Sequence, residues 1–200
     1  MTAAARHRAR AAGAVAALLL LSASSALRAA AQVRASERAR ISQTVDGTTI
    51  TIDYARPRMR GRSPIFGGLV HWGETWTPGA NMATTLETDR DIAIDGHPVP
   101  AGRYSVWLVV AREGPWTLVL DPDAGRFHTN RPREEPGQIR FPVAAVQAAE
   151  TEVLTWSFPD VSATGTSAVM QWADRAVRLP ITVSRNPPAP ARAASPGSRS

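Results

Sequence analysis

The chain has 200 residues and no cysteine, so disulfides and thiolate chemistry are excluded. Its formal net charge is +6, but the stretch from Ile41 to Val183 carries 13 Arg and 16 Asp or Glu, a net of −3. Domains that bind nucleic acid present a basic face, so this mildly acidic stretch argues against nucleic acid as a partner.

The N-terminus has the pattern of a secretory signal peptide, which we predict over residues 1–31. Three Arg between positions 6 and 10 precede an apolar run from Ala11 to Leu21, and Ala29-Ala30-Ala31 precedes the expected cleavage before Gln32. The run is shorter than the roughly 18 residues that indicate a membrane-spanning helix. We therefore expect a secreted or periplasmic protein with no transmembrane segment after cleavage.

Alternation of apolar and polar residues predicts a series of strands after Ile41. Ile50, Ile52 and Tyr54 alternate with polar residues, which is typical of a half-buried strand. The same alternation recurs at residues 116–120, 154–158, 168–172 and 177–183. Asp46-Gly47 and Asp95-Gly96 lie between apolar runs, and Asp-Gly supplies the positive φ angles of a two-residue hairpin.

Roughly nine short strands joined by hairpins favour an all-β fold, an antiparallel two-layer β-sandwich over residues 41–183. A small β-barrel is the alternative. Pro180 lacks an N–H group, so we expect the last strand to lie at a sheet edge or to carry a bulge. We expect residues 32–40 to form a flexible N-terminal arm and residues 184–200, rich in Pro, Ala and Ser, to form a disordered tail.

The stretch from Phe66 to Thr85 has neither helical nor strand periodicity and combines glycine pairs, two Trp, a His, a Glu and an Asn. Such irregular loops on a rigid scaffold are where binding and catalytic groups concentrate. The chain has no G-x-S-x-G, H-E-x-x-H, P-loop or G-x-G-x-x-G motif. We therefore predict no cofactor, and the motifs assign no reaction.

Several short motifs support a family resemblance. They are Tyr54-Ala55-Arg56-Pro57, Gly61-Arg62, Ile65-Phe66-Gly67-Gly68-Leu69-Val70, Gly73-Glu74, Trp76, Gly79-Ala80-Asn81, Ala83-Thr84-Thr85, Pro100-Ala101-Gly102 and Tyr104-Ser105. Together they resemble domain-of-unknown-function family 2911, found in secreted bacterial proteins, over roughly Ile41 to Val183. That family has no assigned activity, so the resemblance implies an exported domain and adds Thr84 to the candidate ligand-binding residues.

The chain departs from the family at two places inside this loop. It has Thr77 where the family often has a basic residue, and His71-Trp72 where the family has proline followed by an aromatic residue. The site of this member is therefore expected to differ from that of its relatives.

Arg56, Arg58, Arg60 and Arg62 occupy every second position, so an extended backbone projects all four to one side. Arginine suits bidentate contacts with carboxylate or phosphate, which makes this row a candidate anion site. The alternative is a solvated edge strand protected from aggregation by charge. We expect Arg56 and Arg62, which flank the turn leading into the glycine-rich loop, to belong to the ligand or ion-pair network.

His71, Glu74 and His128 are of the residue types that ligate zinc, but their spacing matches no closed site, so no metal is predicted. Glu74 lies close in sequence to Trp72 and Trp76, where desolvation could raise its pKa. A hydrolase with Glu74 as general base and His71 or Arg62 assisting is therefore an alternative function.

Trp72 and Trp76 have two interpretations. They form either a stacking platform for a ligand or a plug that closes one end of the sandwich. Asn81 is either a turn residue or a donor aimed into a pocket. Trp107 shares a strand face with Arg103 and Ser105, which predicts partial exposure.

These patterns together predict a binding domain. We expect a small polar or anionic ligand at the 56–85 loop, with Arg56, Arg62, Trp72, Glu74, Trp76, Asn81 and Thr84 as candidate ligand-binding residues. A structural module of the cell envelope, whose loop only seals the core, is a further alternative. The sequence identifies no protein partner.

Overall fold

The computed structural model describes residues 36–183, so the predicted signal peptide and disordered tail lie outside the described residues. The strands in chain order are β1 (Glu37–Val45), β2 (Thr48–Arg56), β3 (Thr75–Trp76), β4 (Thr85–Thr88), β5 (Ile92–Ile94), β6 (His97–Val99), β7 (Gly102–Val109), β8 (Trp116–Asp121), β9 (Ile139–Val143), β10 (Ala145–Ser157) and β11 (Gly165–Val183).

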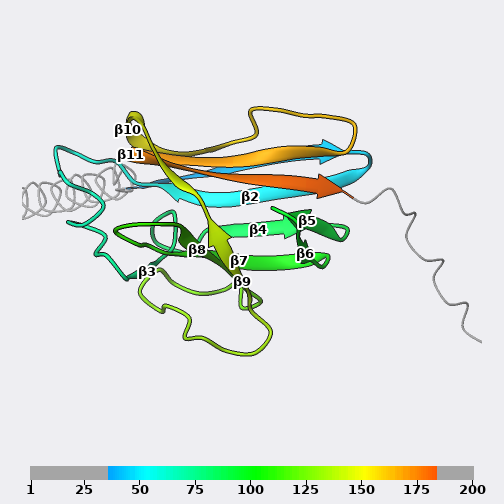
Figure 1. The fold of residues 1–200 in the computed structure, drawn as a ribbon, viewed down its shortest axis with the longest axis horizontal. Coiled ribbons are helices and arrows are strands. Elements are labelled where there is room, and N and C mark those ends of the chain that lie inside the picture. Colours follow the sequence, from blue (N-terminus) through cyan, green and yellow to red (C-terminus); the bar gives the residue numbers. More distant parts are fainter. Residues whose placement is uncertain (1–35, 184–200) are drawn as a thin grey trace, which may run out of the picture. The chain divides into compact units, whose positions relative to one another are not determined.

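The strands form two antiparallel sheets. The larger has the order β1-β2-β4-β7-β8-β9, with β3 also paired to β7, and the smaller has the order β10-β11-β5-β6. Figure 1 shows the long β10 and β11 at the top and the green strands β4 and β7 beneath them. The predicted all-β sandwich is confirmed, and neither sheet closes into a barrel.

Both predicted two-residue hairpins form. Val45 pairs with Thr48 across Asp46-Gly47, and Ile94 pairs with His97 across Asp95-Gly96. All four turn residues have positive φ, between 46° and 80°. That geometry matches the twist of the flanking strands, which is why Asp-Gly fixes the register here.

The two apolar runs after residue 165 belong to a single strand, β11, instead of two. The buried positions change phase between Trp172 and Val177, because Ala173 has a φ of +49° and the β10 register shifts on both sides of it. A bulge of this kind shifts the buried side chains from even-numbered to odd-numbered residues without ending the strand.

The last strand carries a bulge, one of the two features predicted from Pro180, and it is not an edge strand because β11 lies between β10 and β5. Pro180 lies past the last β10 pair, at Val177, and before the first β5 pair, at Ile181, so the missing N–H falls between the two ladders. At the other end, β1 begins at Glu37, inside the segment expected to be a flexible arm, because Glu37 pairs with Arg56 of β2.

One apolar core fills the space between the sheets. Fully buried side chains from both layers form it, including Ile50, Ile52, Leu118, Leu120, Leu154 and Leu179. No helix within residues 36–183 has the length and apolar character needed to cross a membrane.

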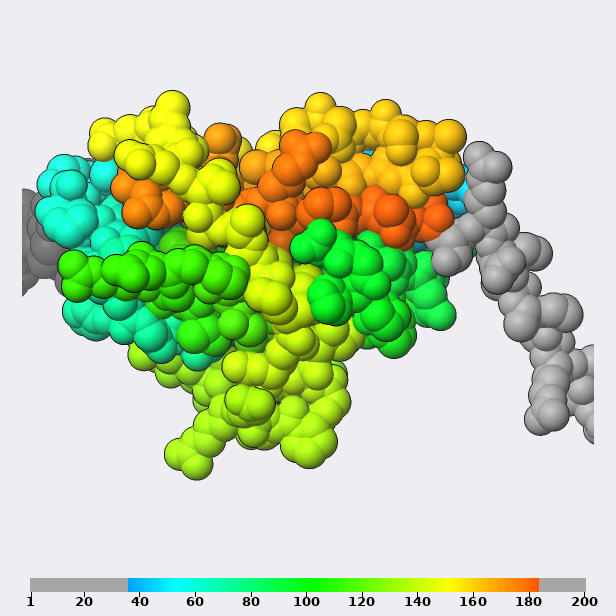
Figure 2. Space-filling view, viewed as in Figure 1, coloured from blue at the N-terminus to red at the C-terminus, as the bar shows by residue number. Residues whose placement is uncertain are grey.

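A second, smaller apolar cluster lies on the outer face of the larger sheet. It contains Ala83, Trp107 and Val119, and Trp107 has an exposed fraction of 0%. The predicted partial exposure of Trp107 is therefore wrong. The reason is the 17-residue segment 122–138 between β8 and β9, which lies against this side of the sheet through the contacts of Arg126 and Gln138. Figure 2 shows this segment as the lime protrusion at the bottom of the view.

Polar side chains hold this covering segment at both ends. The Asp121 carboxylate, with 3% of the side chain exposed, accepts from Arg126 Nε at 3.2 Å and from Gln138 Nε2 at 2.6 Å. Trp107 Nε1 donates to Ser105 Oγ at 2.9 Å, and Ser105 Oγ donates to the Asp123 carbonyl at 2.8 Å. We call Ser105, Trp107, Asp121, Arg126 and Gln138 the outer-face cluster.

Candidate functional site

The segment 57–84 joins β2 to β4 and contains the predicted site. Its first residues cross from the larger sheet to the smaller one: Leu154 N donates to the Pro57 carbonyl and Met59 N donates to the Glu152 carbonyl, both at 2.9 Å. The chain then reverses at Arg60-Gly61, where φ is +52° and +71° and Arg62 N donates to the Met59 carbonyl at 3.0 Å. We call residues 58–62 the basic turn.

The four alternating Arg do not lie on one face, contrary to the expectation from an extended backbone. β2 ends at Arg56, and the positive φ angles of Arg60-Gly61 turn the chain back. Arg60 donates its backbone N–H to Glu152 Oε1 at 3.0 Å. Arg58 and Arg62 are both exposed. The positive charge is therefore distributed around a tight turn and not along a strand.

Backbone and hydroxyl oxygens orient two of these guanidinium groups. Arg56 Nε lies 3.4 Å from the Leu154 carbonyl, and its Nη2 donates to Thr155 Oγ1 at 3.0 Å. Arg62 donates through Nε to the Met59 carbonyl at 2.9 Å and through Nη2 to the Arg58 carbonyl at 2.5 Å. Neither Arg56 nor Arg62 forms an ion pair with a carboxylate among residues 36–183.

Aromatic side chains close this end of the core. Trp76 stacks on Trp172 with ring centroids 5.8 Å apart, and Phe66 packs edge-on against Trp76 at 5.5 Å. Phe66 also contacts Trp116 at 5.0 Å. Phe66, Trp76, Trp116 and Trp172 form what we call the aromatic plug. It matches the plug interpretation of Trp76 more closely than the ligand-platform interpretation.

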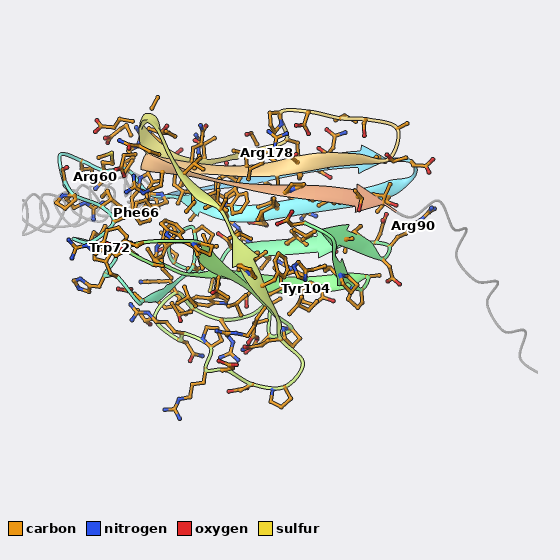
Figure 3. The ribbon with its side chains drawn as sticks, in the orientation of Figure 1. Arg60, Phe66, Trp72, Arg90, Tyr104 and Arg178 are labelled. Carbon is orange, nitrogen blue, oxygen red and sulfur yellow. The ribbon has the colours of Figure 1, made fainter. Side chains whose placement is uncertain are left out.

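Trp72 is half-buried beside the plug and rests on Gly67. A Cβ atom at Gly67 would lie 2.4 Å from Trp72 Nε1, and Gly67 has a φ of +87°. Glycine is required here on both counts, because an L side chain is strained at that angle and the indole ring occupies its place. Figure 3 shows Arg60, Phe66 and Trp72 at one end of the sandwich, with Arg90 at the other.

Glu74 is engaged by its own loop and by the covering segment. Its Oε2 accepts from His71 N at 3.0 Å, and its Oε1 forms an ion pair with Arg131. The side chain of Glu74 is 11% exposed and that of Arg131 is 50% exposed. This pair ties the 57–84 segment to the 122–138 segment, so Glu74 has a structural partner that the sequence did not reveal.

Thr84 lies inside the protein instead of lining a binding surface. It has an exposed fraction of 0%, donates through Oγ1 to the Pro78 carbonyl at 2.8 Å and donates through its backbone N–H to Thr77 Oγ1 at 3.0 Å. Thr77 in turn donates to the Val106 carbonyl at 2.9 Å. A buried Thr77 explains locally why a basic residue is absent from this position.

Asn81 and His128 meet at a separate surface. Asn81 has a φ of +63°, and its carbonyl accepts from His128 N at 2.8 Å, with His128 Nδ1 at 2.9 Å. Met82 bridges to Phe127 beside them, and both are nearly half exposed. Asn81 thus acts as a turn residue through its backbone.

The predicted site residues therefore separate into groups. Arg56 and Arg62 lie beside β10, Glu74 and His71 form a loop with Arg131, Thr84 is buried, and Asn81 contacts His128. No three His, Asp or Glu side chains within the described residues could hold a metal ion.

Sequence reasoning missed the outer-face cluster and Arg131. A signal was present, because a 17-residue connection is longer than the roughly 12–15 residues of most structureless loops. A connection of this length often packs over apolar surface. Here it covers Trp107, whose side chain would otherwise lie in solvent on the outer face of the larger sheet.

A comparison with protein-family models matches residues 36–181 to the family described as Protein of unknown function (DUF2911). No curated protein and no solved structure matches the chain. The match covers most of the chain and includes both sheets, the basic turn and the aromatic plug. The chain belongs to the DUF2911 family.

Proposed function

We propose that this domain is exported and binds anionic ligands at the basic turn. The observation that carries the proposal is an excess of basic residues in one segment, in which neither Arg56 nor Arg62 forms an ion pair within residues 36–183. The segment 56–84 contains four Arg and one carboxylate, Glu74, and that carboxylate is paired with Arg131 from a different segment. The segment has a net charge of +3, whereas the whole stretch from Ile41 to Val183 has a net charge of −3.

The geometry of Arg62 suits an anion ligand. Carbonyl oxygens hold its Nε and Nη2, so the plane of the guanidinium is fixed by its own turn. Within residues 36–183 its Nη1 has no hydrogen-bond partner, and Arg58 is exposed on the same turn. A fixed guanidinium loses less side-chain entropy on binding, and arginine pairs well with carboxylate and phosphate oxygens.

The hydrolase alternative gains less support. A general base needs a free carboxylate within reach of the proton that it abstracts. Glu74 uses one oxygen for Arg131 and the other for His71 N.

The structural alternative explains the aromatic plug and buried Thr84, yet it gives no reason for the exposed Arg58 and Arg62. The loop can seal the core with its aromatic residues and bind anions with its basic turn.

The expected affinity for a small anion is modest. An exposed ion pair contributes about 0–1 kcal/mol, so two Arg contacts supply about 2 kcal/mol at most. A dissociation constant of about 1 mM corresponds to about 4 kcal/mol. Monovalent anions should therefore bind weakly, and anions with several charges should bind better.

Thermal unfolding in the presence of inorganic pyrophosphate tests the proposal. We expect pyrophosphate, compared with chloride at equal ionic strength, to raise the melting temperature of the wild-type chain. The Arg58→Gln/Arg62→Gln double variant should lose this increase. Arg103→Gln is the matched control, because Arg103 is also an exposed Arg, 49% exposed, but lies on β7. An equal increase in all three proteins, or none in the wild type, contradicts the proposal.

A further inference from the structure

The basic turn is followed in the chain by an exposed leucine that the packing of the loop does not bury. Leu69 is 46% exposed, although its neighbour Val70 is 3% exposed and Phe66 is 5% exposed. Leu69 N donates to the Pro64 carbonyl at 3.4 Å, two residues after Arg62. The turn from Ile65 to Val70 thus places an apolar side chain in solvent seven residues after Arg62 in the chain.

We propose that Arg58, Arg62 and Leu69, which we call the docking rim, bind the surface of a bilayer that contains anionic lipid. This inference rests on the proposed function and names the source of the anion. The two Arg contact lipid phosphates, and Leu69 enters the boundary between headgroups and acyl chains. Basic residues near an anionic bilayer and a buried apolar side chain are the two contributions that bind peripheral proteins reversibly.

The form of the rim favours an extended surface over a small ligand. Arg58 and Arg62 lie on a reversing turn, and Leu69 lies on a second turn a few residues later in the chain. Figure 2 shows the teal segment that contains these turns at the left end of the molecule. An extended surface offers contacts to exposed side chains on both turns, whereas a single small anion would meet only one or two of them. A bilayer supplies many anions and an apolar layer at once.

The overall charge of the domain does not oppose this contact. The carboxylates nearest to the turn along β10 are Glu150 and Glu152, and Glu152 accepts the backbone N–H of Arg60. The remaining acids are distributed over the rest of the fold. At physiological salt, charges more than about 8 Å from the contact are largely screened, so the sign of the interaction is decided by Arg58 and Arg62 against the single carboxylate of Glu152 at the turn.

Vesicle sedimentation tests the inference with the full chain. Vesicles of phosphatidylcholine alone are compared with vesicles that also contain phosphatidylglycerol, and the difference is the lipid-dependent binding. Every variant shares residues 1–35, so differences between variants report the docking rim. Arg58→Gln/Arg62→Gln should lower the partition coefficient about 30-fold, since each Arg near an anionic surface contributes about fivefold. Leu69→Ser should lower it about fivefold.

Two controls match these changes. Arg103→Gln removes an exposed Arg on β7 that pairs with Glu87 at 4.0 Å, and Val161→Ser removes an apolar side chain that is 55% exposed in a different loop. Both should bind vesicles as the wild type does, and added sodium chloride should weaken wild-type binding. Equal binding by all variants, or no dependence on phosphatidylglycerol, overturns the inference.

The remaining outcomes separate the two proposals. If pyrophosphate still raises the melting temperature through Arg58 and Arg62 but vesicles do not bind, the lipid inference is wrong and the anion site stands. If the Arg variant loses vesicle binding and Leu69→Ser does not, the ligand is a phosphate group without membrane insertion, and the inference is again overturned. If neither pyrophosphate nor vesicles bind, both proposals fail.

Discussion

The two long irregular segments, 57–84 and 122–138, both cover apolar surface but do so in different ways. The first supplies its own aromatic residues, Phe66 and Trp76, which pack against Trp116 and Trp172 at the end of the core. The second covers Trp107, an aromatic that belongs to a strand. A loop can therefore be essential to the burial of apolar surface without carrying the apolar residues itself.

Their anchors differ accordingly. The first segment is fixed mainly by ring contacts and by backbone turns. The second is fixed by hydrogen bonds and an ion pair, with the Asp121 carboxylate bound to Arg126 near one end and Gln138 at the other. The basic turn anchors to β10 through Met59 and Arg60, but its Arg58 and Arg62 side chains are exposed, which is why we assign binding to them.

Truncation of Trp107 should lower the free energy of unfolding more than any other single change considered below. Trp107→Ala should lower the free energy of unfolding by about 4 kcal/mol, because the ring is fully buried and its N–H is paired. Trp76→Ala should cost about 2 kcal/mol, because Trp76 is only half-buried. Urea midpoints at unchanged m-values measure both. A larger loss for Trp76→Ala reverses the comparison and contradicts the role given to the 122–138 segment.

Asp121 is the next position in expected effect. Asp121→Ala should cost about 3 kcal/mol, because it leaves Arg126, whose side chain is 15% exposed, without its buried partner. The 122–138 segment should also become sensitive to limited proteolysis. Asp123→Ala is the control: its side chain is 55% exposed and its loss should cost less than about 1 kcal/mol. Equal protease resistance in the two variants would show that Asp121 does not hold the segment.

Gly67 tests the packing of the first segment. Gly67→Ala should cost about 2 kcal/mol, through the positive φ and through the contact with the Trp72 ring. Gly73→Ala in the same loop is the matched control, because Gly73 has a φ of +84° but nothing lies within 4 Å of an added Cβ. It should cost about 1 kcal/mol. Equal losses would mean that Trp72 does not rest on Gly67.

The smallest expected effect is the coupling between the two segments. A double-mutant cycle of Glu74→Gln and Arg131→Gln should give an interaction energy of about 0.5–1 kcal/mol, because Arg131 is half exposed and water screens the pair. An interaction energy of zero would mean that the Glu74–Arg131 ion pair contributes no stabilisation between the two segments. Chemical denaturation of the four proteins of the cycle provides the values.

The strands were predictable because their signals are local. Alternation located the buried residues of β2 and β8, and Asp46-Gly47 fixed a hairpin. Trp107 was not predictable in this way, because its cover comes from a mostly polar segment that begins 15 residues later in the chain. Period-two patterns report which face of a strand a residue occupies, and they do not report what lies over that face.

The candidate site was predictable only in outline. The sequence identified the segment 57–84 and the residue types, and it named the Trp pair and Glu74. It could not show that Glu74 pairs with Arg131, 57 residues away, or that Thr84 is buried. It also treated the Arg row as extended, because the turn at Arg60-Gly61 depends on two successive positive φ angles that alternation hides.

Anion binding at the basic turn can be separated from fold stabilisation by the covering segment through amide hydrogen exchange of the full chain, with and without inorganic pyrophosphate. Pyrophosphate should slow exchange at residues 58–62 and leave exchange across residues 122–138 unchanged, with the latter already protected where backbone bonds to residues 81–83 form. Protection confined to residues 122–138, or no protection in residues 58–62, would contradict this separation.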